Sequence, residues 1–134
     1  MAATKTILTS GKRKKAIARV ALTAGTGKIT INNADISVFE PAIARLKLQE
    51  PLILAGKVSE KVDIKIQVNG GGYMGQVQAA RLAVARALVE KDKKLKETFL
   101  DYDRQLLIGD VRQKEPVKPN SHGSARSKRQ KSYR

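Results

Sequence analysis

The chain has 134 residues and carries 27 Lys and Arg against 12 Asp and Glu, a net charge of +15. This length allows one domain with an appended segment rather than two domains. The absence of cysteine and the single histidine exclude a disulfide framework, a thiolate metal site and a cysteine nucleophile. No apolar run is long enough to cross a membrane, and the first residues lack the apolar stretch of a signal peptide. We therefore expect a cytosolic protein with no membrane partner.

The positive charge is concentrated at the two ends of the chain. Residues 1–34 carry +7, residues 35–110 only +1, and residues 111–134 again +7. The last segment has no aliphatic residue larger than alanine after Val117, so it cannot bury enough apolar surface to fold by itself. We therefore predict a globular body over residues 1–110 and an extended basic tail over residues 111–134, with nucleic acid as the polyanionic partner.

The first third of the chain shows the alternation of apolar and polar residues that is typical of strands. Residues 4–10 predict a short edge strand that ends at Gly11, and residues 16–24 predict a second strand. Residues 28–32 alternate again after a glycine-containing loop, so the runs on either side of this loop predict a β-hairpin. Residues 33–40 begin with helix-capping residues and predict at most one helical turn.

A first helical region precedes the clearest strand, residues 62–68, in which apolar and polar residues alternate without interruption. Pro41 suits the first position of a helix over residues 42–50. Pro51 then breaks or restarts this helix, which ends near Gly56. Its apolar content comes from Ile43, Leu46 and Leu48.

The strongest helical pattern covers residues 76–92, where an apolar stripe is formed by Val77, Ala80, Val84, Ala87 and Leu88. Residues 93–103 predict a short second helix whose inward-facing side chains are Leu95, Phe99 and Leu100. The order of elements predicts an α+β fold with helices on one face of a mixed sheet. General rules of chain handedness predict a right-handed crossover.

A run of four consecutive cations precedes the second strand: Lys12, Arg13, Lys14 and Lys15. Arg19 follows on the side of that strand that faces away from Val20. Cations on the exposed side of a strand can follow a phosphate backbone, whereas lysines can also protect a sheet edge from pairing with another chain. The absence of any acid from residues 1–34 favours phosphate contact.

A glycine-rich segment joins the clearest strand to the long helix and comprises Gly70, Gly71, Gly72 and Tyr73. Glycines let backbone N–H groups approach an oxyanion, and a helix N-terminus adds partial positive charge. The segment lacks the Lys-Ser/Thr pair of a Walker loop and the spacing of a dinucleotide fingerprint. A polynucleotide phosphate or a plain turn therefore remain as interpretations. Arg81, about one and a half turns into the helix, either shares this phosphate surface or faces solvent.

The tail supplies further cations as candidates for RNA contact: Arg112, Lys114, Lys118, Arg126, Lys128, Arg129 and Lys131. Tyr133 has no core to join, so it either stacks on a base or sugar or is merely exposed. His122 has no second histidine or cysteine as a partner in metal binding. The acids Asp101, Asp103 and Asp110 have no base or nucleophile beside them, so we predict surface or cap roles for them. We expect no enzyme site, no metal and no cofactor.

Several motifs occur in a fixed order: GKRKKAIARV, GTGKITINN, VNGGGYMGQVQAARLAVARAL, LLIGDVRQKE and a terminal KRQKSYR. Together they closely resemble the family of the ninth protein of the small ribosomal subunit in its archaeal/eukaryotic-type form, over essentially the whole chain. This resemblance implies a two-layer α/β domain of the ribosomal S5 domain 2-like type, with three strands, a helix, a strand and a helix. Its crossover is left-handed, contrary to the general rule above.

The resemblance also implies a structural role in the head of the small subunit during translation. The expected partners are the ribosomal RNA, neighbouring head proteins and the anticodon stem-loop of the peptidyl-site transfer RNA, with no small-molecule substrate. The cation run and the three glycines match the RNA-facing motifs of the body, and the tail residues matched to transfer RNA contact are Lys131, Tyr133 and Arg134. The bacterial form ends in Ser-Lys-Arg, so the cation at its penultimate position is absent here.

Two other functions fit parts of the same sequence. The family fold is similar to that of some metabolite kinases, so the glycine segment also allows a small-molecule kinase that binds nucleotide there. The high positive charge also allows a protein that compacts DNA. Saturable ATP binding would favour the kinase, and a preference for folded ribosomal RNA over duplex DNA would exclude the DNA-compacting protein.

Overall fold

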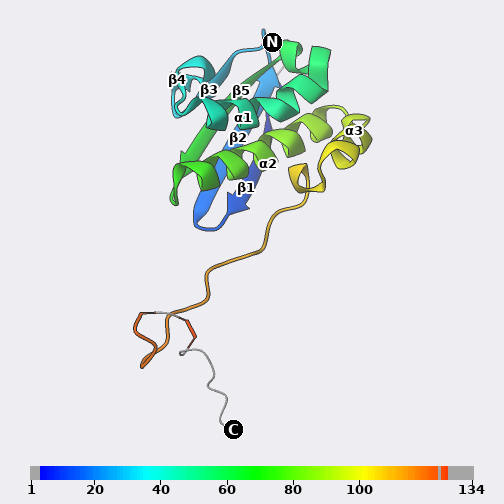
Figure 1. Ribbon diagram of the computed structural model, residues 1–134. Helices are drawn as coiled ribbons and strands as arrows, with labels where there is room; N and C mark the ends of the chain where they lie inside the picture. The colour runs from blue at the N-terminus through cyan, green and yellow to red at the C-terminus, as the bar shows by residue number, and fades with distance from the viewer. Residues whose placement is uncertain (1–3, 124, 127–134) are drawn as a thin grey trace.

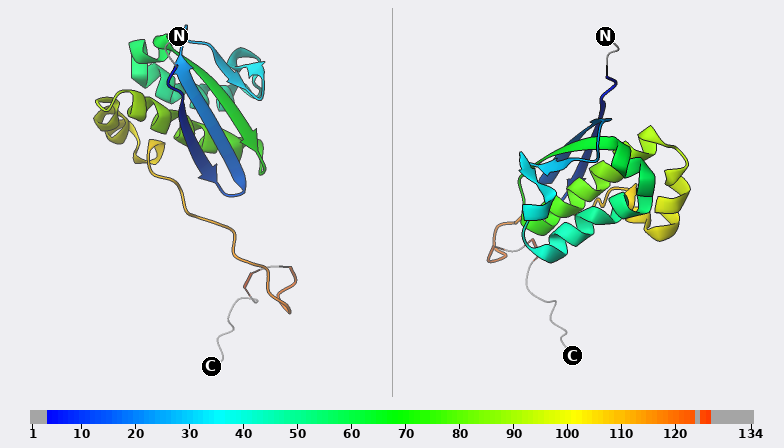
Figure 2. Two further views of the ribbon diagram at one scale, coloured as in Figure 1. Left: turned by 180° about the vertical axis from the view of Figure 1, so that it is seen from behind. Right: turned by 90° about the horizontal axis from the view of Figure 1, so that it is seen from above.

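The computed structural model describes residues 4–123 and 125–126 of the chain. These residues form one sheet with helices on one of its faces, while the other face stays open (Figures 1 and 2). The strands are β1 (Ile7–Arg13), β2 (Ala16–Ala24), β3 (Ile29–Ile31), β4 (Ala34–Asp35) and β5 (Val62–Asn69). The α-helices are α1 (Ala42–Ala55), α2 (Tyr73–Lys91) and α3 (Leu95–Tyr102), and the 3-10 turns are η1 (Ile36–Val38), η2 (Gly56–Lys61) and η3 (Arg104–Leu106). The predicted α+β class is confirmed.

The strand order in the sheet is β1-β2-β5-β3-β4. β5 runs antiparallel to β2 and parallel to β3, and β4 is a short antiparallel addition to β3. The hairpin predicted between residues 16–24 and 28–32 is wrong, because β5 lies between these two runs. Alternation within a run indicates which face a side chain occupies but does not identify the neighbouring strand. The actual hairpin joins β1 to β2 through Lys14 and Lys15.

The loop between β2 and β3 passes the start of β5 and is fastened there by Asp63. The Asp63 carboxylate accepts hydrogen bonds from the backbone N–H groups of Thr26 at 2.9 Å and Lys28 at 3.0 Å. These bonds, that of Lys28 first, hold the pKa of Asp63 below its ordinary value. The chain can therefore leave β2 and re-enter the sheet on the far side of β5.

β1 runs through Gly11 rather than ending there, so the predicted end of the first strand is wrong. Gly11 is buried and pairs with Ala18 of β2. A Cβ atom on Gly11 would lie 2.3 Å from the carbonyl oxygen of Ala79 on α2. The glycine is therefore required by the close approach of a strand and a helix and not by a turn.

α1 is continuous through Pro51, which is buried inside the helix, and Pro41 is its N-cap rather than its first helical residue. Its apolar side chains divide between two faces: Leu48 is buried, whereas Ile43 and Leu46 are exposed. The sequence-based expectation of a break at Pro51 is therefore wrong. The buried face consists of Ala44, Leu48, Pro51, Leu52 and Ala55, and the helix ends at Gly56, which has a φ of 57°.

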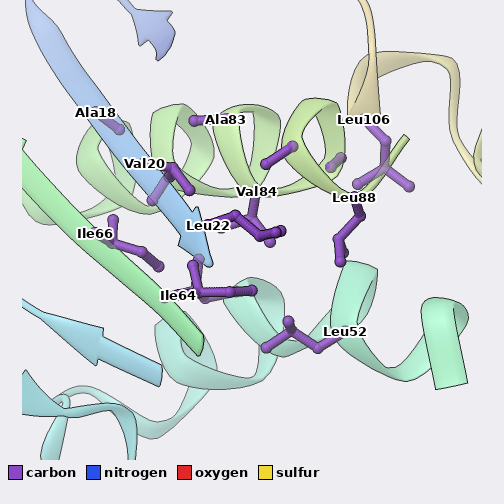
Figure 3. Close-up of a cluster of buried hydrophobic side chains, with 14 of the residues drawn as sticks. Ala18, Val20, Leu22, Leu52, Ile64, Ile66, Ala83, Val84, Leu88 and Leu106 are labelled. Carbon is purple, nitrogen blue, oxygen red and sulfur yellow. The ribbon is translucent and has the colours of Figure 1, made fainter. Parts of the chain in front are cut away.

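The core lies between the sheet and the alanine-rich helix α2. Figure 3 shows Val20 and Leu22 of β2 and Ile64 and Ile66 of β5 packed toward Val84 and its neighbours. The apolar stripe predicted on α2 is confirmed, although the helix begins three residues before the predicted start, at Tyr73. In α3, Leu95 and Phe99 are buried as predicted, whereas Leu100 is exposed because it lies on the solvent side of this short helix.

The connection from β3 through α1 to β5 is left-handed. In Figure 1 the helices lie in front of the sheet, and the chain passes from β3 to the parallel strand β5 on its right while both strands point downward. β5 lies between β3 and β2, and α1 covers the same face of the sheet as α2. With the helix on that face, a connection from β3 to β5 has to be left-handed. The general rule therefore fails for this chain, and the crossover implied by the family resemblance is confirmed.

Candidate nucleic-acid interface

The cation run forms the tip of the β1–β2 hairpin, where its members have different surroundings. Lys12, Lys14 and Lys15 are exposed, and Lys14 occupies the turn with a φ of 54°. None of these lysines forms an ion pair within the part of the chain that the structure describes. Their ammonium groups are therefore available to an external anion.

Arg13 of the same run is directed into the protein, and its side chain is only 12% exposed. Its guanidinium contacts Asp110 at 3.4 Å, Gln78 of α2 at 2.8 Å and the carbonyl oxygen of Arg112 at 3.4 Å. Arg13 therefore joins the hairpin to α2 and to the segment that follows η3. Sequence reasoning missed this role because the partners of Arg13 lie far away along the chain.

The glycine segment packs directly against the tip of the hairpin. Gly70 and Gly71 have positive φ values of 75° and 63°, and a Cβ atom on Gly70 would lie 2.6 Å from the carbonyl oxygen of Lys15. Gly72 is different, since it has no positive φ and no atom lies within 4 Å of its ideal Cβ position. The plain-turn interpretation therefore explains why glycine occupies positions 70 and 71. At position 72, neither the backbone conformation nor the packing requires a glycine.

The N-terminus of α2 follows this segment and has no side-chain cap and no acid in its first turn. Helix geometry leaves the N–H groups of the first turn without partners inside the helix, where they add partial positive charge. Tyr73, the first residue of α2, is 57% exposed. This helix end therefore offers backbone donors and an exposed aromatic ring at the same place.

These features surround one hollow of ≈ 860 Å³, which we call the hairpin groove. Its walls come from the hairpin tip, the start of α2 and the segment after η3, and its lining contains no acid. The lining residues are Arg13, Lys14, Lys15, Gly71, Gly72, Tyr73, Met74, Gly75, Arg112, Gln113 and Lys114. The structure thus brings together three of the four predicted cations of the run, two of the three predicted glycines and the first cations of the predicted tail, while Lys12 lies outside the groove.

A second cationic area lies on the open face of the sheet (Figure 2, left view). Arg19 is exposed there opposite Gln67 of β5, and Lys65 is the exposed residue two positions earlier on that strand. A hollow of ≈ 440 Å³ beside Arg19 is also lined by Lys15, Asn69 and other polar residues. Sequence reasoning missed Lys65, although the alternation of residues 62–68 already puts it on the face opposite Ile64 and Ile66.

Arg81 has acidic partners rather than a solvent-facing position. Its side chain is 14% exposed and forms ion pairs with Glu50 of α1 and, at 3.1 Å, with Asp103. Asp103 also caps η3 by accepting a hydrogen bond from the N–H of Gln105 at 2.9 Å. The cap role predicted for Asp103 is confirmed, and the predicted RNA contact of Arg81 competes with these two ion pairs.

The segment after η3 has neither helix nor strand over residues 111–120, all of which are exposed. Lys114 and Lys118 therefore face solvent, as RNA contact requires, whereas Arg112 is 75% exposed but forms an ion pair with Asp110 at 2.7 Å. Arg126 forms a hydrogen-bonded ion pair with Glu115 at 2.8 Å, in which both side chains are largely exposed. Exposed ion pairs contribute little to stability because solvent screens them, so a phosphate can replace the carboxylate at little cost. Other predicted tail contacts lie outside the described residues: Lys128, Arg129, Lys131, Tyr133 and Arg134.

The described residues contain no group of three or more His, Asp or Glu arranged to hold a metal ion, and none of their helices could span a membrane. A one-sided α/β body with an acid-free cationic groove and a basic C-terminal segment is typical of nucleic-acid-binding proteins.

Comparison with known proteins identifies the family. A family profile described as "Ribosomal protein S9/S16" matches residues 11–134. A curated relative from Methanothrix thermoacetophila, "Small ribosomal subunit protein uS9", is 48% identical over 132 residues, which cover 97% of this chain and 99% of the relative. The chain belongs to the ribosomal protein S9 family. It is therefore a structural ribosomal protein rather than an enzyme, and is located in the ribosome within the cytoplasm. This result excludes the kinase and DNA-compacting alternatives.

Proposed function

We propose that this chain, a structural constituent of the small ribosomal subunit, binds ribosomal RNA in the head of the subunit through the hairpin groove. The observation that carries this proposal is the groove itself, to which separate segments contribute cations and no segment contributes an acid. A phosphodiester backbone is the polyanion that such a surface recognises through charge and backbone N–H donors.

Within the groove, Lys14 and Lys15 neutralise phosphates from the hairpin side, and Arg112 and Lys114 do so from the tail side. Backbone N–H groups at the start of α2 donate hydrogen bonds to a phosphate oxygen, and the exposed ring of Tyr73 stacks on a base or a sugar. Lys12, Arg19 and Lys65 extend the contact over the hairpin edge and the open sheet face. RNA shape rather than base identity determines this recognition, because the groove consists mainly of cations and backbone.

The tail continues the contact away from the body. Its cations are separated by small or polar residues, which lets an extended chain pass between RNA helices without steric hindrance. Lys118, Arg126, Lys128 and Arg129 neutralise phosphates along this path, and the residues that reach the anticodon stem-loop of the peptidyl-site transfer RNA are Lys131, Tyr133 and Arg134. Head proteins are further partners, and Ile43, Leu46 and Ile53 on the exposed side of α1 are available to them.

The test is the salt dependence with which the full-length protein binds a transcript of the head domain of the ribosomal RNA. The double variant Lys14→Gln/Lys15→Gln should lower the slope of log affinity against log salt by roughly 0.7–0.9 for each phosphate that the variant no longer neutralises. The matched control is Lys93→Gln/Lys94→Gln, which removes two exposed cations at the turn between α2 and α3. Equal slopes for the two double variants would contradict the proposal, because binding would then depend on total charge alone.

A further inference from the structure

Asp110 is the acid nearest in sequence to the basic tail, yet its side chain is only 10% exposed. The Asp110 carboxylate accepts hydrogen bonds from the backbone N–H of Arg112 at 3.0 Å and from the Arg112 guanidinium at 2.7 Å. It also contacts the Arg13 guanidinium at 3.4 Å. One carboxylate therefore lies between a cation of the hairpin and a cation of the tail.

Arg13, in turn, is held in place by contacts that do not involve Asp110. Its Nε atom donates to Oε1 of Gln78 on α2 at 2.8 Å, and its Nη1 atom donates to the carbonyl oxygen of Arg112 at 3.4 Å. The contact with Gln78 thus fixes Arg13 to α2, and both Arg13 and the Asp110 carboxylate attach the first residues of the tail to this frame.

Apolar packing does not supply this attachment. The last buried apolar side chain before the tail is Leu106, while Ile108 is 44% exposed and Val111 89% exposed. Leu107 still packs against the core, and its carbonyl oxygen accepts a hydrogen bond from Arg86 at 3.4 Å. Beyond Leu107 the direction of the chain is therefore set mainly by the polar contacts among Arg13, Asp110 and Arg112.

We propose that Asp110 is a positioning residue that sets the direction in which the tail leaves the body. This direction keeps Arg112 and Lys114 on the wall of the hairpin groove opposite Lys14 and Lys15, so that the hairpin and the start of the tail bind the same segment of RNA. The second part of this inference rests on the proposed function, whereas the first part concerns the free protein alone.

A carboxylate suits this position for an electrostatic reason. The groove gathers several like charges, whose mutual repulsion would drive the tail away from the hairpin. The negative charge of Asp110 offsets that repulsion and is shielded from RNA phosphates by its two arginine partners. Hydrogen bonds from the Arg112 side chain, and then from its backbone N–H, hold the pKa of Asp110 far below its ordinary value, so the group stays charged at neutral pH.

The first measurement is the distribution of distances between two spin labels in the full-length protein without RNA. The chain has no natural cysteine, so labels can be placed specifically at Lys14→Cys and Lys118→Cys. We expect the distribution of distances to be broader in Asp110→Asn than in the wild type. In Asp110→Glu, which keeps the negative charge, it should be nearly as narrow as in the wild type. The matched control, Asp101→Asn, removes an exposed acid of α3 and should leave the distribution unchanged. An unchanged distribution in Asp110→Asn would overturn the inference whatever the RNA results.

The second measurement is the affinity of the unlabelled variants for the head-domain transcript. Asp110→Asn adds net positive charge, so nonspecific electrostatics predicts tighter binding. Our inference predicts weaker binding, by roughly 3- to 10-fold, because a freely oriented tail has a lower effective concentration at the shared RNA segment. Suppose that Lys14→Gln/Lys15→Gln binds the transcript more weakly than its control Lys93→Gln/Lys94→Gln. Tighter or unchanged binding by Asp110→Asn would then overturn the inference. Failure of that lysine variant to weaken binding would instead contradict the proposed function.

Discussion

The body and the tail use the same basic residue types in opposite ways. In the body, Arg13 and Arg81 are largely enclosed and each contacts carboxylates, so their charges hold elements of the fold together. In residues 111–134, eight cations accompany a single acid, Glu115, and the few apolar side chains, such as Val111 and Val117, are too few to form a core around them. Burial therefore decides whether a cation stabilises this protein or faces its ligand, since the exposed Arg112 and Arg126 also have carboxylate partners.

The largest test of this contrast removes a core side chain. Phe99 is fully buried at 0% exposure between α3 and the rest of the body. Phe99→Ala should lower the free energy of unfolding by about 3–5 kcal/mol because it removes buried apolar area and leaves a cavity. Urea denaturation followed by circular dichroism measures this decrease. The folded fraction should still bind the head-domain transcript with the wild-type salt slope, and a reduced slope would show that body and tail are not separable.

A smaller effect is expected where β1 approaches α2. Gly11→Ala should destabilise the protein by about 1–3 kcal/mol, because its new Cβ atom would lie 2.3 Å from the Ala79 carbonyl oxygen and one element must shift. Gly72→Ala is the matched control, since it has open space at its Cβ position and no positive φ. Thermal unfolding of the two variants compares them directly, and equal midpoints would contradict the close packing of β1 on α2.

Arg81→Gln tests the structural use of a cation. It removes the ion pairs with Glu50 and Asp103 and should cost about 1–3 kcal/mol of unfolding free energy, as expected for hydrogen bonds to charged groups. Arg104→Gln, which removes an exposed arginine of η3, should leave stability nearly unchanged. If Arg81→Gln instead weakens RNA binding while the protein keeps its stability, the RNA contact predicted from the sequence is correct and the structural role is not.

Acid should loosen the loop that Asp63 fastens. A carboxyl group whose pKa is lower in the folded than in the unfolded state stabilises the fold above its unfolded pKa, and this contribution disappears as the pH falls through the folded pKa. Wild-type protein should therefore lose unfolding free energy below about pH 4, and Asp63→Asn should show a smaller decrease over the same range. Urea denaturation at several pH values measures both. The same series on Asp101→Asn separates the effect of removing one charge from the effect of releasing the loop.

Removal of residues 128–134 should have the smallest effect on stability. The apolar core of the described residues is formed between Ile7 and Leu107, so we expect the unfolding midpoint and assembly into the small subunit to stay unchanged. We expect retention of peptidyl-site transfer RNA, or accuracy of start-site selection, to decrease, because the shortened tail no longer neutralises the phosphates proposed above. Filter binding of transfer RNA to subunits that carry the truncated protein measures retention. Unchanged retention and unchanged start-site accuracy together would contradict the proposed role of the tail.

Elements defined by local periodicity could be predicted from the sequence. The alternation of residues 62–68 and the apolar stripe of the long helix each depend on neighbours within a few positions, and both appear in the structure as β5 and α2. The order of strands could not be predicted in the same way. Insertion of β5 between β2 and β3 depends on contacts between distant parts of the chain, which a local pattern does not contain.

The candidate site shows the same division. The hairpin lysines were found as an exposed cation run, and Lys65 could have been found from the alternation of its strand. The different role of Arg13 could not have been found, because it depends on Asp110 and Gln78, which the sequence separates from the hairpin. The tail boundary after residue 110 and the contacts of residues 128–134 stay predictions from charge and composition.

The span of the contact between Arg13 and Arg112 has a consequence for the order in which the molecule matures. These residues are 99 positions apart, so the hairpin leaves the ribosome that synthesises the chain well before the segment that closes its groove. A nascent fragment that ends before Arg112 therefore contains the hairpin lysines but lacks one wall of the hairpin groove. The groove proposed to bind RNA is therefore complete only after Arg112 has been synthesised.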